Sequence, residues 1–320
     1  MKIVFGSFKG LCEIAPLPLC RLVEGNYANG PKCYSRSIDT QTFVIFQPAT
    51  LALEMVSLIM TVFMIIHIRT KYTAIGRREI SLFFYIYVLE IILEIIVVSG
   101  VIPTRLPLYR YFVAAHLSVI SAAVFCLLLN GFVGFHFVED GTVLSVWFIR
   151  IFSLATGGIS FCLSMGTFNS IVLNAKKPVL LWIWIYVVHS AAILLYGVMQ
   201  IVLVFRTLDD LWPLGNIILG LGFFFLGQVT LNLLSTQICH GASHYIDGLF
   251  FACLCSLLSV MMVYKYWDSL TKDDLEFVVT GGRKQWEITD LPDENMSDLF
   301  DTSGCLTDFA YNNGTHNTTR

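Results

Sequence analysis

Residues 235–277 decide the fold of this chain, and they read STQICHGASHYIDGLFFACLCSLLSVMMVYKYWDSLTKDDLEF. The centre of this stretch, residues 245–267, is mostly apolar. At ~1.5 Å of rise per residue, a helix of this length measures about 34 Å, which is enough to cross a bilayer. A cysteine and two histidines precede the centre, and acidic residues follow it. The stretch therefore predicts a membrane-spanning helix that joins a thiol-bearing surface to a charged tail.

The composition of the whole chain also indicates a membrane environment. Of its 320 residues, 56% are hydrophobic and 13% are charged, and the mean hydropathy is +0.72. Soluble domains carry about 25% charged residues. We therefore predict an all-α integral membrane protein, and we expect it to contact the lipid bilayer and no nucleic acid.

Along the whole chain, the hydropathy pattern predicts a bundle of seven transmembrane helices, of which this helix is the last. Each segment has the roughly 18 or more residues that a spanning helix needs. The predicted spans are residues 43–68, 80–102, 111–137, 143–168, 179–205, 213–235 and 245–267. The chain thus divides into a Cys-containing N-terminal segment, a bundle and a tail. Their bounds are residues 1–42, 43–267 and 268–320.

A basic cluster between the first two predicted spans sets the expected orientation. It consists of Arg69, Lys71, Arg77 and Arg78. Short cytosolic loops carry an excess of Lys and Arg. We therefore place this loop in the cytosol, which puts the N-terminus in the lumen and the C-terminus in the cytosol. The margin is small, because further basic residues then fall on the lumenal side, namely Arg105, Arg110, Lys176 and Lys177.

The tail has eleven acidic and four basic residues. Past about residue 280 it shows no apolar periodicity, so we expect it to be largely disordered. Asp274 and Glu276 form an Asp-x-Glu triplet, the form that vesicle-coat cargo receptors read as a signal for exit from the endoplasmic reticulum. An acidic tail also produces such a triplet by chance. Three sequons in the tail would report on the orientation, at Asn295, Asn313 and Asn317.

Four of the nine cysteines fall on the proposed lumenal side, namely Cys12, Cys20, Cys33 and Cys239. The lumen is oxidising, so four thiols there predict two disulfides, with unpaired thiols as the alternative. Three connectivities are possible, and the sequence does not distinguish them. A bridge from the N-terminal segment to Cys239 would hold that segment over the start of the seventh helix.

The third predicted span carries small, mildly polar residues at four-residue spacing. This stripe consists of Ala114, Ser118, Ala122, Cys126, Asn130 and Gly134. The fourth span repeats the pattern more briefly, at Thr156, Ser160 and Ser164. Small residues let neighbouring helix backbones approach closely. We interpret both stripes as packing surfaces within the bundle, with a docking face for another protein's helices as the alternative.

Four charged residues lie within the predicted spans, namely Glu54, Glu90, Glu94 and Arg150. Each costs at least ~2.5 kcal/mol at the centre of a membrane helix. We expect them to face inward, with one glutamate paired to Arg150 or hydrogen-bonded while neutral. The alternative is a proton-coupled or small-solute transporter that uses Glu90 and Glu94, which share one helix face. No internal repeat is visible in the sequence, and this disfavours an inverted-repeat transporter.

His240 and His244 are four residues apart, next to Cys239 and shortly before Asp247. Their spacing would suit two metal ligands on one helical face, as in a metal-dependent seven-helix membrane hydrolase. Such a site needs a further ligand, and His116 is the only candidate in the lumenal half. We therefore expect these histidines to anchor a helix end, and we predict no metal, cofactor or catalytic residue.

The signatures of other seven-helix classes are missing from the sequence. A G-protein-coupled receptor would show an acidic-Arg-aromatic triplet at the end of the third span, where this chain reads GFVGFHFVEDGT. An opsin would need a lysine in the middle of the seventh span, whereas Lys265 lies two residues from its end. P-loop, GxSxG and kinase motifs are also missing. We therefore expect no enzyme activity.

Six elements of the sequence resemble one known family. In order they are PLPLC (16–20), CYSRSID (33–39), KYTAIGRRE (71–79), NGFVGFHFVEDGTVLSVWFIR (130–150), STQICHGASHYIDGLFF (235–251) and MMVYKYWDSLTKDDLEF (261–277). Together they are similar to the fungal chitin synthase export chaperones. The resemblance covers about residues 10–278 and leaves the rest of the tail uncovered.

The resemblance implies a multi-pass protein of the endoplasmic reticulum membrane. Such a protein would help its partner, a chitin synthase, to fold or assemble and to leave for the cell surface, and so support cell-wall chitin synthesis. The family has no catalytic residues to carry over. Further expectations are contact with vesicle-coat cargo receptors and travel beside the client to the plasma membrane.

Overall fold

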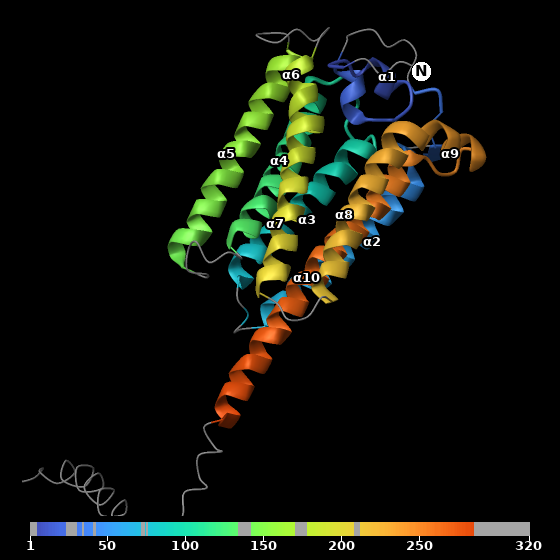
Figure 1. Ribbon diagram of the computed structural model, residues 1–320. Coiled ribbons are helices and arrows are strands. Elements are labelled where there is room, and N and C mark those ends of the chain that lie inside the picture. Colours follow the sequence, from blue (N-terminus) through green and yellow to red (C-terminus); the bar gives the residue numbers. More distant parts are fainter. Residues whose placement is uncertain are drawn as a thin grey trace, which may run out of the picture. The chain divides into compact units, whose positions relative to one another are not determined.

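The computed structural model describes residues 5–23, 31–33, 35–40, 43–71, 74, 76–133, 142–169, 178–207 and 212–284, with the backbone alone for residues 40, 43, 133, 207 and 272–284. Within these residues, seven helical segments are long and apolar enough to cross a membrane (Figure 1). The predicted seven-helix membrane bundle is therefore confirmed. Residues Met1–Thr271 form one compact unit, which is described below.

The seven segments follow the predicted order. Four are single helices near the start of the bundle: α2 (Pro48–Thr70), α3 (Arg77–Val98), α4 (Pro107–Val133) and α5 (Val143–Phe168). Two are helical runs with a π-helical part: α6, η2 and α7 (Val179–Trp182, Ile183–Val188, His189–Thr207), then α8, η3 and α9 (Trp212–Val229, Thr230–Leu234, Ser235–Gly241). The seventh is α10 (Gly248–Lys284).

The N-terminal segment contains α1 (Lys9–Cys12), the 3-10 turn η1 (Pro18–Arg21) and a two-stranded antiparallel hairpin. The hairpin pairs β1 (Ile38–Thr40) with β2 (Phe43–Ile45), and Ile38 lies opposite Ile45. The predicted start of the first span at residue 43 is therefore wrong, because residues 43–45 pair as a strand. The helix begins at Pro48, where a missing amide hydrogen leaves no bond unmade.

The ends of α3 and α10 also differ from the predicted ends. Gly100 follows α3 with a φ of 77°, and the ring of Phe46 occupies the space where a Cβ would lie. The helix therefore ends at Val98 and not at residue 102. At the other end of the chain, α10 continues past residue 267 to Lys284, because loss of hydrophobicity ends a membrane span without ending a helix. Residues 285–320 lie outside the described residues.

The N-terminal segment is packed into one end of the bundle. Phe8 is fully buried and Val23 is 1% exposed. Both belong to a core cluster with side chains from α3 to α6, among them Val97, Tyr109, Val113, Phe168 and Leu181. In Figure 1 this blue segment lies at the end of the bundle where α6 begins. We call the described part of residues 5–47 the N-terminal cap.

The small-residue stripe of α4 packs against α5. The Ser118 hydroxyl donates a hydrogen bond of 2.8 Å to the Gly157 carbonyl, and the Ser160 hydroxyl donates one of 3.2 Å to the Leu117 carbonyl. A Cβ on Gly157 would lie 3.4 Å from that of Ala122. These contacts use the stripe inside the bundle. Ala114 and Cys126 are fully buried, Asn130 donates to the Cys126 carbonyl, and Gly134 lies outside the described residues.

Candidate functional site

Two disulfides hold the N-terminal cap. One joins Cys12 to Cys20, eight residues apart, and the other joins Cys33 to Cys239, 206 residues apart. Their Cα atoms are separated by 5.6 and 6.0 Å. Of the three connectivities that the sequence leaves open, the structure has this one. The second bridge attaches the cap to α9, directly before the turn into α10.

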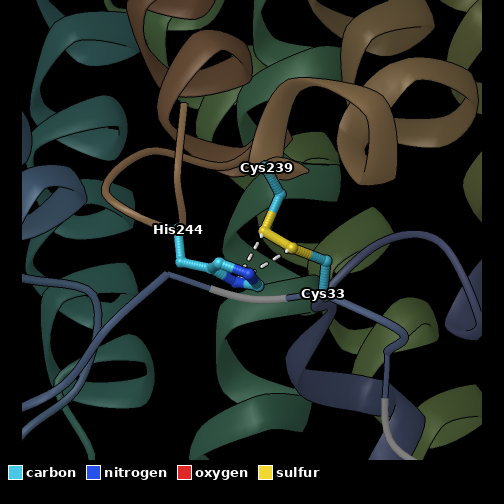
Figure 2. A group of neighbouring side chains, drawn as sticks. All are labelled: Cys33, Cys239 and His244. Carbon is cyan, nitrogen blue, oxygen red and sulfur yellow. Dashed lines mark hydrogen bonds between the residues drawn. A yellow bond between two sulfur atoms is a disulfide. The ribbon is translucent and has the colours of Figure 1, made fainter. Parts of the chain in front are cut away.

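The imidazole of His244 lies against the Cys33–Cys239 disulfide, and Figure 2 shows its ring pointing at the two sulfur atoms. Nδ1 is 3.2 Å from the Cys33 sulfur and 3.8 Å from the Cys239 sulfur. A disulfide sulfur is not a thiolate, so these sulfurs are not free metal ligands. Among the described residues, His240 belongs to no group of three or more potential metal ligands. The histidine pair thus does not form a ligand set.

Asp247 joins the cap to the start of α10. The carboxylate is fully buried and accepts a hydrogen bond of 3.2 Å from the amide of Phe250, as a helix N-cap does. It also accepts bonds from Gln47 Nε2, at 3.0 Å, and from the Ser35 hydroxyl, at 3.4 Å. Burial raises the pKa of Asp247, and the hydrogen bonds from Phe250, Leu249 and Ser35 oppose this rise. An Asp just before an apolar run is a helix-start signal in the sequence, and it could have indicated that Asp247 is the N-cap of α10.

A cavity of about 320 Å³ lies inside the bundle, below the N-terminal cap. The cap contributes Leu17, Pro18 and Leu19 to its lining. The titratable side chains that line it come from five of the membrane spans: Glu54, Tyr87, Glu90, Glu94, His116, Tyr186, His189, Tyr196, Cys253 and Tyr266. The three glutamates that were expected to face inward therefore meet at one site.

The polar groups of this cavity form two overlapping clusters. In the first, Glu90 Oε1 lies 3.5 Å from His116 Nε2, and Glu94 completes a group whose donor atoms are all within 4.8 Å of one another. In the second, the Cys253 thiol donates a hydrogen bond of 3.4 Å to Glu94 Oε1, and Glu54 completes a group of the same size. Glu94 belongs to both clusters. Glu90 and Glu94 share a face of α3, as their spacing of four residues indicates.

Arg150 does not join these carboxylates. The sequence predicts that one glutamate pairs with an inward-facing Arg150 or is hydrogen-bonded while neutral, but the Arg150 side chain is exposed on the outer face of α5. Its guanidinium lies 5.7 Å from the centroid of the Trp147 ring. The inward-facing Arg150 is wrong, because this residue lies two turns from the start of α5, where a long side chain reaches the interface and stacks on an aromatic ring.

Both π-helical segments face the cavity and contact each other. The Tyr186 hydroxyl of η2 donates a hydrogen bond of 3.1 Å to Asn232 Oδ1 of η3. Next to η2, His189 Nε2 lies 2.9 Å from the Ser121 hydroxyl of α4. Short π-helical segments often mark functional sites. Here they place Tyr186 and His189 toward the cavity.

Sequence reasoning missed several partners in this site. It considered His116 only as a possible ligand beside His240 and His244, whereas the structure places it next to Glu90. It assigned no role to Cys253. No local signal indicates these contacts, because the residues lie on different helices. Asp274 and Glu276 fall within α10, and nothing is described of their side chains.

Comparison with known proteins gives one consistent result. A family model described as chitin synthase export chaperone matches residues 4–281. The chitin synthase export chaperone of Chaetomium globosum is 48% identical over 299 residues, which cover 91% of this chain and 90% of the relative. That of Neurospora crassa is 48% identical over 294 residues (90% and 82%). That of Aspergillus fumigatus is 45% identical over 299 residues (91% and 90%). No solved structure matches this chain.

Proposed function

This chain belongs to the chitin synthase export chaperone family, and from that membership we propose that it helps a chitin synthase to fold and to leave the endoplasmic reticulum. The observation that carries this proposal is the family match along residues 4–281, which includes all seven membrane spans. The protein would thereby support cell-wall chitin synthesis. The match does not favour the transporter or the membrane hydrolase.

The bundle suggests how such assistance would work. Before it is fully folded, a membrane enzyme exposes polar transmembrane residues and helix faces that have no partner yet. A second bundle can cover these surfaces until the enzyme is assembled. The stripe on α4 is used against Gly157 of α5, so the client would contact other faces of this bundle. Assistance of this kind needs binding and no catalytic chemistry.

We place the protein in the membrane of the endoplasmic reticulum, with the N-terminal cap in the lumen. The two disulfides of the cap support this placement, because disulfides persist in oxidising compartments. The basic residues that follow α2 would then face the cytosol. Travel with the client to the plasma membrane would be an extension of the same role.

The cytosolic part of α10 would carry the export signal. Asp274 and Glu276 lie beyond the membrane-spanning part of α10, which ends at Thr271. We propose that they recruit vesicle-coat cargo receptors once the client is bound. In this scheme the bundle binds the client and the end of α10 contacts the transport machinery.

Deletion of the gene and rescue with variants tests the proposal. Without this protein, a fluorescently tagged chitin synthase should remain in the endoplasmic reticulum, and the wild-type chain should restore its surface delivery. A D274N/E276Q variant should still bind the synthase in a mild-detergent pull-down but should export it more slowly. Normal surface delivery in the deletion strain would refute the chaperone role. Normal export by the double variant would refute only the export signal.

A further inference from the structure

The three carboxylates of the cavity lie where charge is costly. Glu54, Glu90 and Glu94 are all on membrane-spanning helices, and an ionised carboxylate inside a bilayer needs a compensating positive charge. No Lys or Arg is among the described residues that line the cavity. Arg150 is exposed on the outer face of α5. The groups beside the carboxylates are instead an imidazole and a thiol, both of which bind metals.

The geometry of Glu90, Glu94 and His116 fits a single metal ion. Their donor atoms lie within 4.8 Å of one another, and Glu90 Oε1 is 3.5 Å from His116 Nε2. Two ligands of a tetrahedral zinc ion, each roughly 2.0–2.2 Å from the metal, lie about 3.4 Å apart. His116 is 8% exposed, and its buried Nε2 makes no hydrogen bond among the described residues; its 3.5 Å contact with Glu90 Oε1 is an ion pair only when the imidazole is protonated. That nitrogen is therefore available as a ligand.

The chemistry of the donors favours zinc over other divalent cations. Calcium and magnesium prefer six or more oxygen ligands, whereas zinc accepts imidazole nitrogen together with carboxylate oxygen in a four-coordinate site. Glu90 and Glu94, when ionised, carry two negative charges, which one divalent ion neutralises. The Cys253 thiol donates to Glu94 Oε1 and so orients this carboxylate, as groups around a metal site commonly do.

We propose that Glu90, Glu94 and His116 bind a zinc ion inside the bundle. The ion would join α3 to α4, and its three ligands line the same cavity as the cap residues Leu17, Pro18 and Leu19. This site is separate from His240 and His244, the pair whose spacing in the sequence would suit two metal ligands, because these histidines lie in α9 and the turn after it. The inference goes beyond the export role, and it assigns no reaction to the metal.

Metal analysis of the full-length protein tests the proposal. The chain is purified in mild detergent without chelators, and its metal content is measured by mass spectrometry. We expect about one zinc ion per chain and a rise in melting temperature when zinc is added back to chelator-treated protein. Calcium and magnesium should give no such rise. The variants E90Q, E94Q and H116Q should each lower the bound zinc at least tenfold.

Two histidine variants outside the cavity provide matched controls. H240Q removes an exposed imidazole, and H244Q removes the one that contacts the disulfide. Both should retain the zinc of the wild type. Wild-type protein that contains no zinc and shows no melting response to it would overturn the proposal. Zinc retained in H116Q, or lost in H244Q alone, would overturn it as well. If H116Q does not fold, E90Q, E94Q and the melting response of the wild type still decide.

Discussion

At the residue scale, one buried titratable side chain, that of Asp247, connects the N-terminal cap to the seventh span. Its side chain caps α10 through the Phe250 amide and holds Gln47 and Ser35. The same carboxylate is fully buried, and burial raises its pKa. Because the folded pKa exceeds the unfolded one, the stability that protonation contributes is full at low pH. That contribution is lost as the pH rises through the folded pKa.

Substitution of Asp247 should separate capping from charge. Asn caps helices about as well as Asp, so Asp247→Asn should keep the helix N-cap of α10, whereas Asp247→Ala should lose about 1–2 kcal/mol of stability. The stability of the wild type relative to Asp247→Asn should fall as the pH rises above about 4, the ordinary pKa of Asp, because the folded pKa is raised. Thermal melts of the purified protein across this range measure both effects. A constant difference between these two proteins would contradict the buried-charge argument.

The two disulfides should differ in their contribution to stability. In the chain-entropy model a bridge that closes a longer loop restricts the unfolded chain more. The Cys33–Cys239 bridge spans 206 residues and the Cys12–Cys20 bridge spans 8. The double change Cys33→Ser/Cys239→Ser should therefore cost roughly 5 kcal/mol, and Cys12→Ser/Cys20→Ser roughly 3 kcal/mol.

Thermal melts in detergent compare the two double variants. Cys162→Ser is a suitable control, because Cys162 is a free and exposed cysteine of α5. It should melt like the wild type. Equal losses for the two double variants would argue against loop length as the cause.

At the element scale, glycines set how closely the membrane helices approach. Gly227 of α8 lies against α10, where an added Cβ would be 2.9 Å from the Cys255 Cβ and 3.4 Å from the Ala252 carbonyl. Gly222 lies on the same helix and has nothing within 4 Å of an added Cβ. One position is therefore a close helix contact and the other is open.

These two glycines form a matched pair. Gly227→Ala should destabilise the bundle by about 1–3 kcal/mol, because neither backbone can yield without moving a whole helix. Gly222→Ala should be neutral or should stabilise α8 by up to about 1 kcal/mol, since Ala is the better helix former. Melting temperatures in one detergent measure both. A similar change in the two variants would show that α8 and α10 are not in close contact.

At the scale of the whole molecule, contacts at its two ends tie distant parts of the chain together. At one end, the N-terminal cap is held by the disulfide to Cys239 and by the bonds to Asp247. At the other end of α2, Lys71 forms an ion pair with Asp268 and donates to the Thr271 hydroxyl, at 3.3 Å. Both sets of contacts end on α10 or just before it. The seventh helix thus connects the proposed lumenal and cytosolic sides.

Glycosylation in cells should report which end faces the lumen. With a cytosolic tail, the sequons at Asn295, Asn313 and Asn317 should remain unmodified, and endoglycosidase should not change the mobility of the wild type. Ala28→Thr completes a sequon at Asn26 in the N-terminal segment, and this variant should lose mobility unless it is treated. Modification of the tail together with an unmodified Asn26 would reverse the proposed orientation.

The sequence by itself determined the membrane class, the seven spans and their approximate places. Hydropathy, length and proline or glycine positions are local properties, and a bilayer selects helices on these properties alone. The Glu90 and Glu94 pair was likewise visible, because two residues four apart share a helix face whatever surrounds it. The same reasoning misplaced the ends of α2 and α3, where a strand pair and a glycine contact from elsewhere in the chain intervene.

Only the tertiary structure decided which distant groups meet. It selected one of three cysteine pairings, turned Arg150 outward, and brought His116 and Cys253 to the glutamates. The physical reason is that the disulfide to Cys239 and the contacts of His116 and Cys253 with the glutamates join residues on different helices or in distant loops, and the direction of Arg150 follows from the rotation of α5 in the bundle. Such contacts depend on how helices rotate and cross, which the packing of the whole bundle sets and no local pattern records.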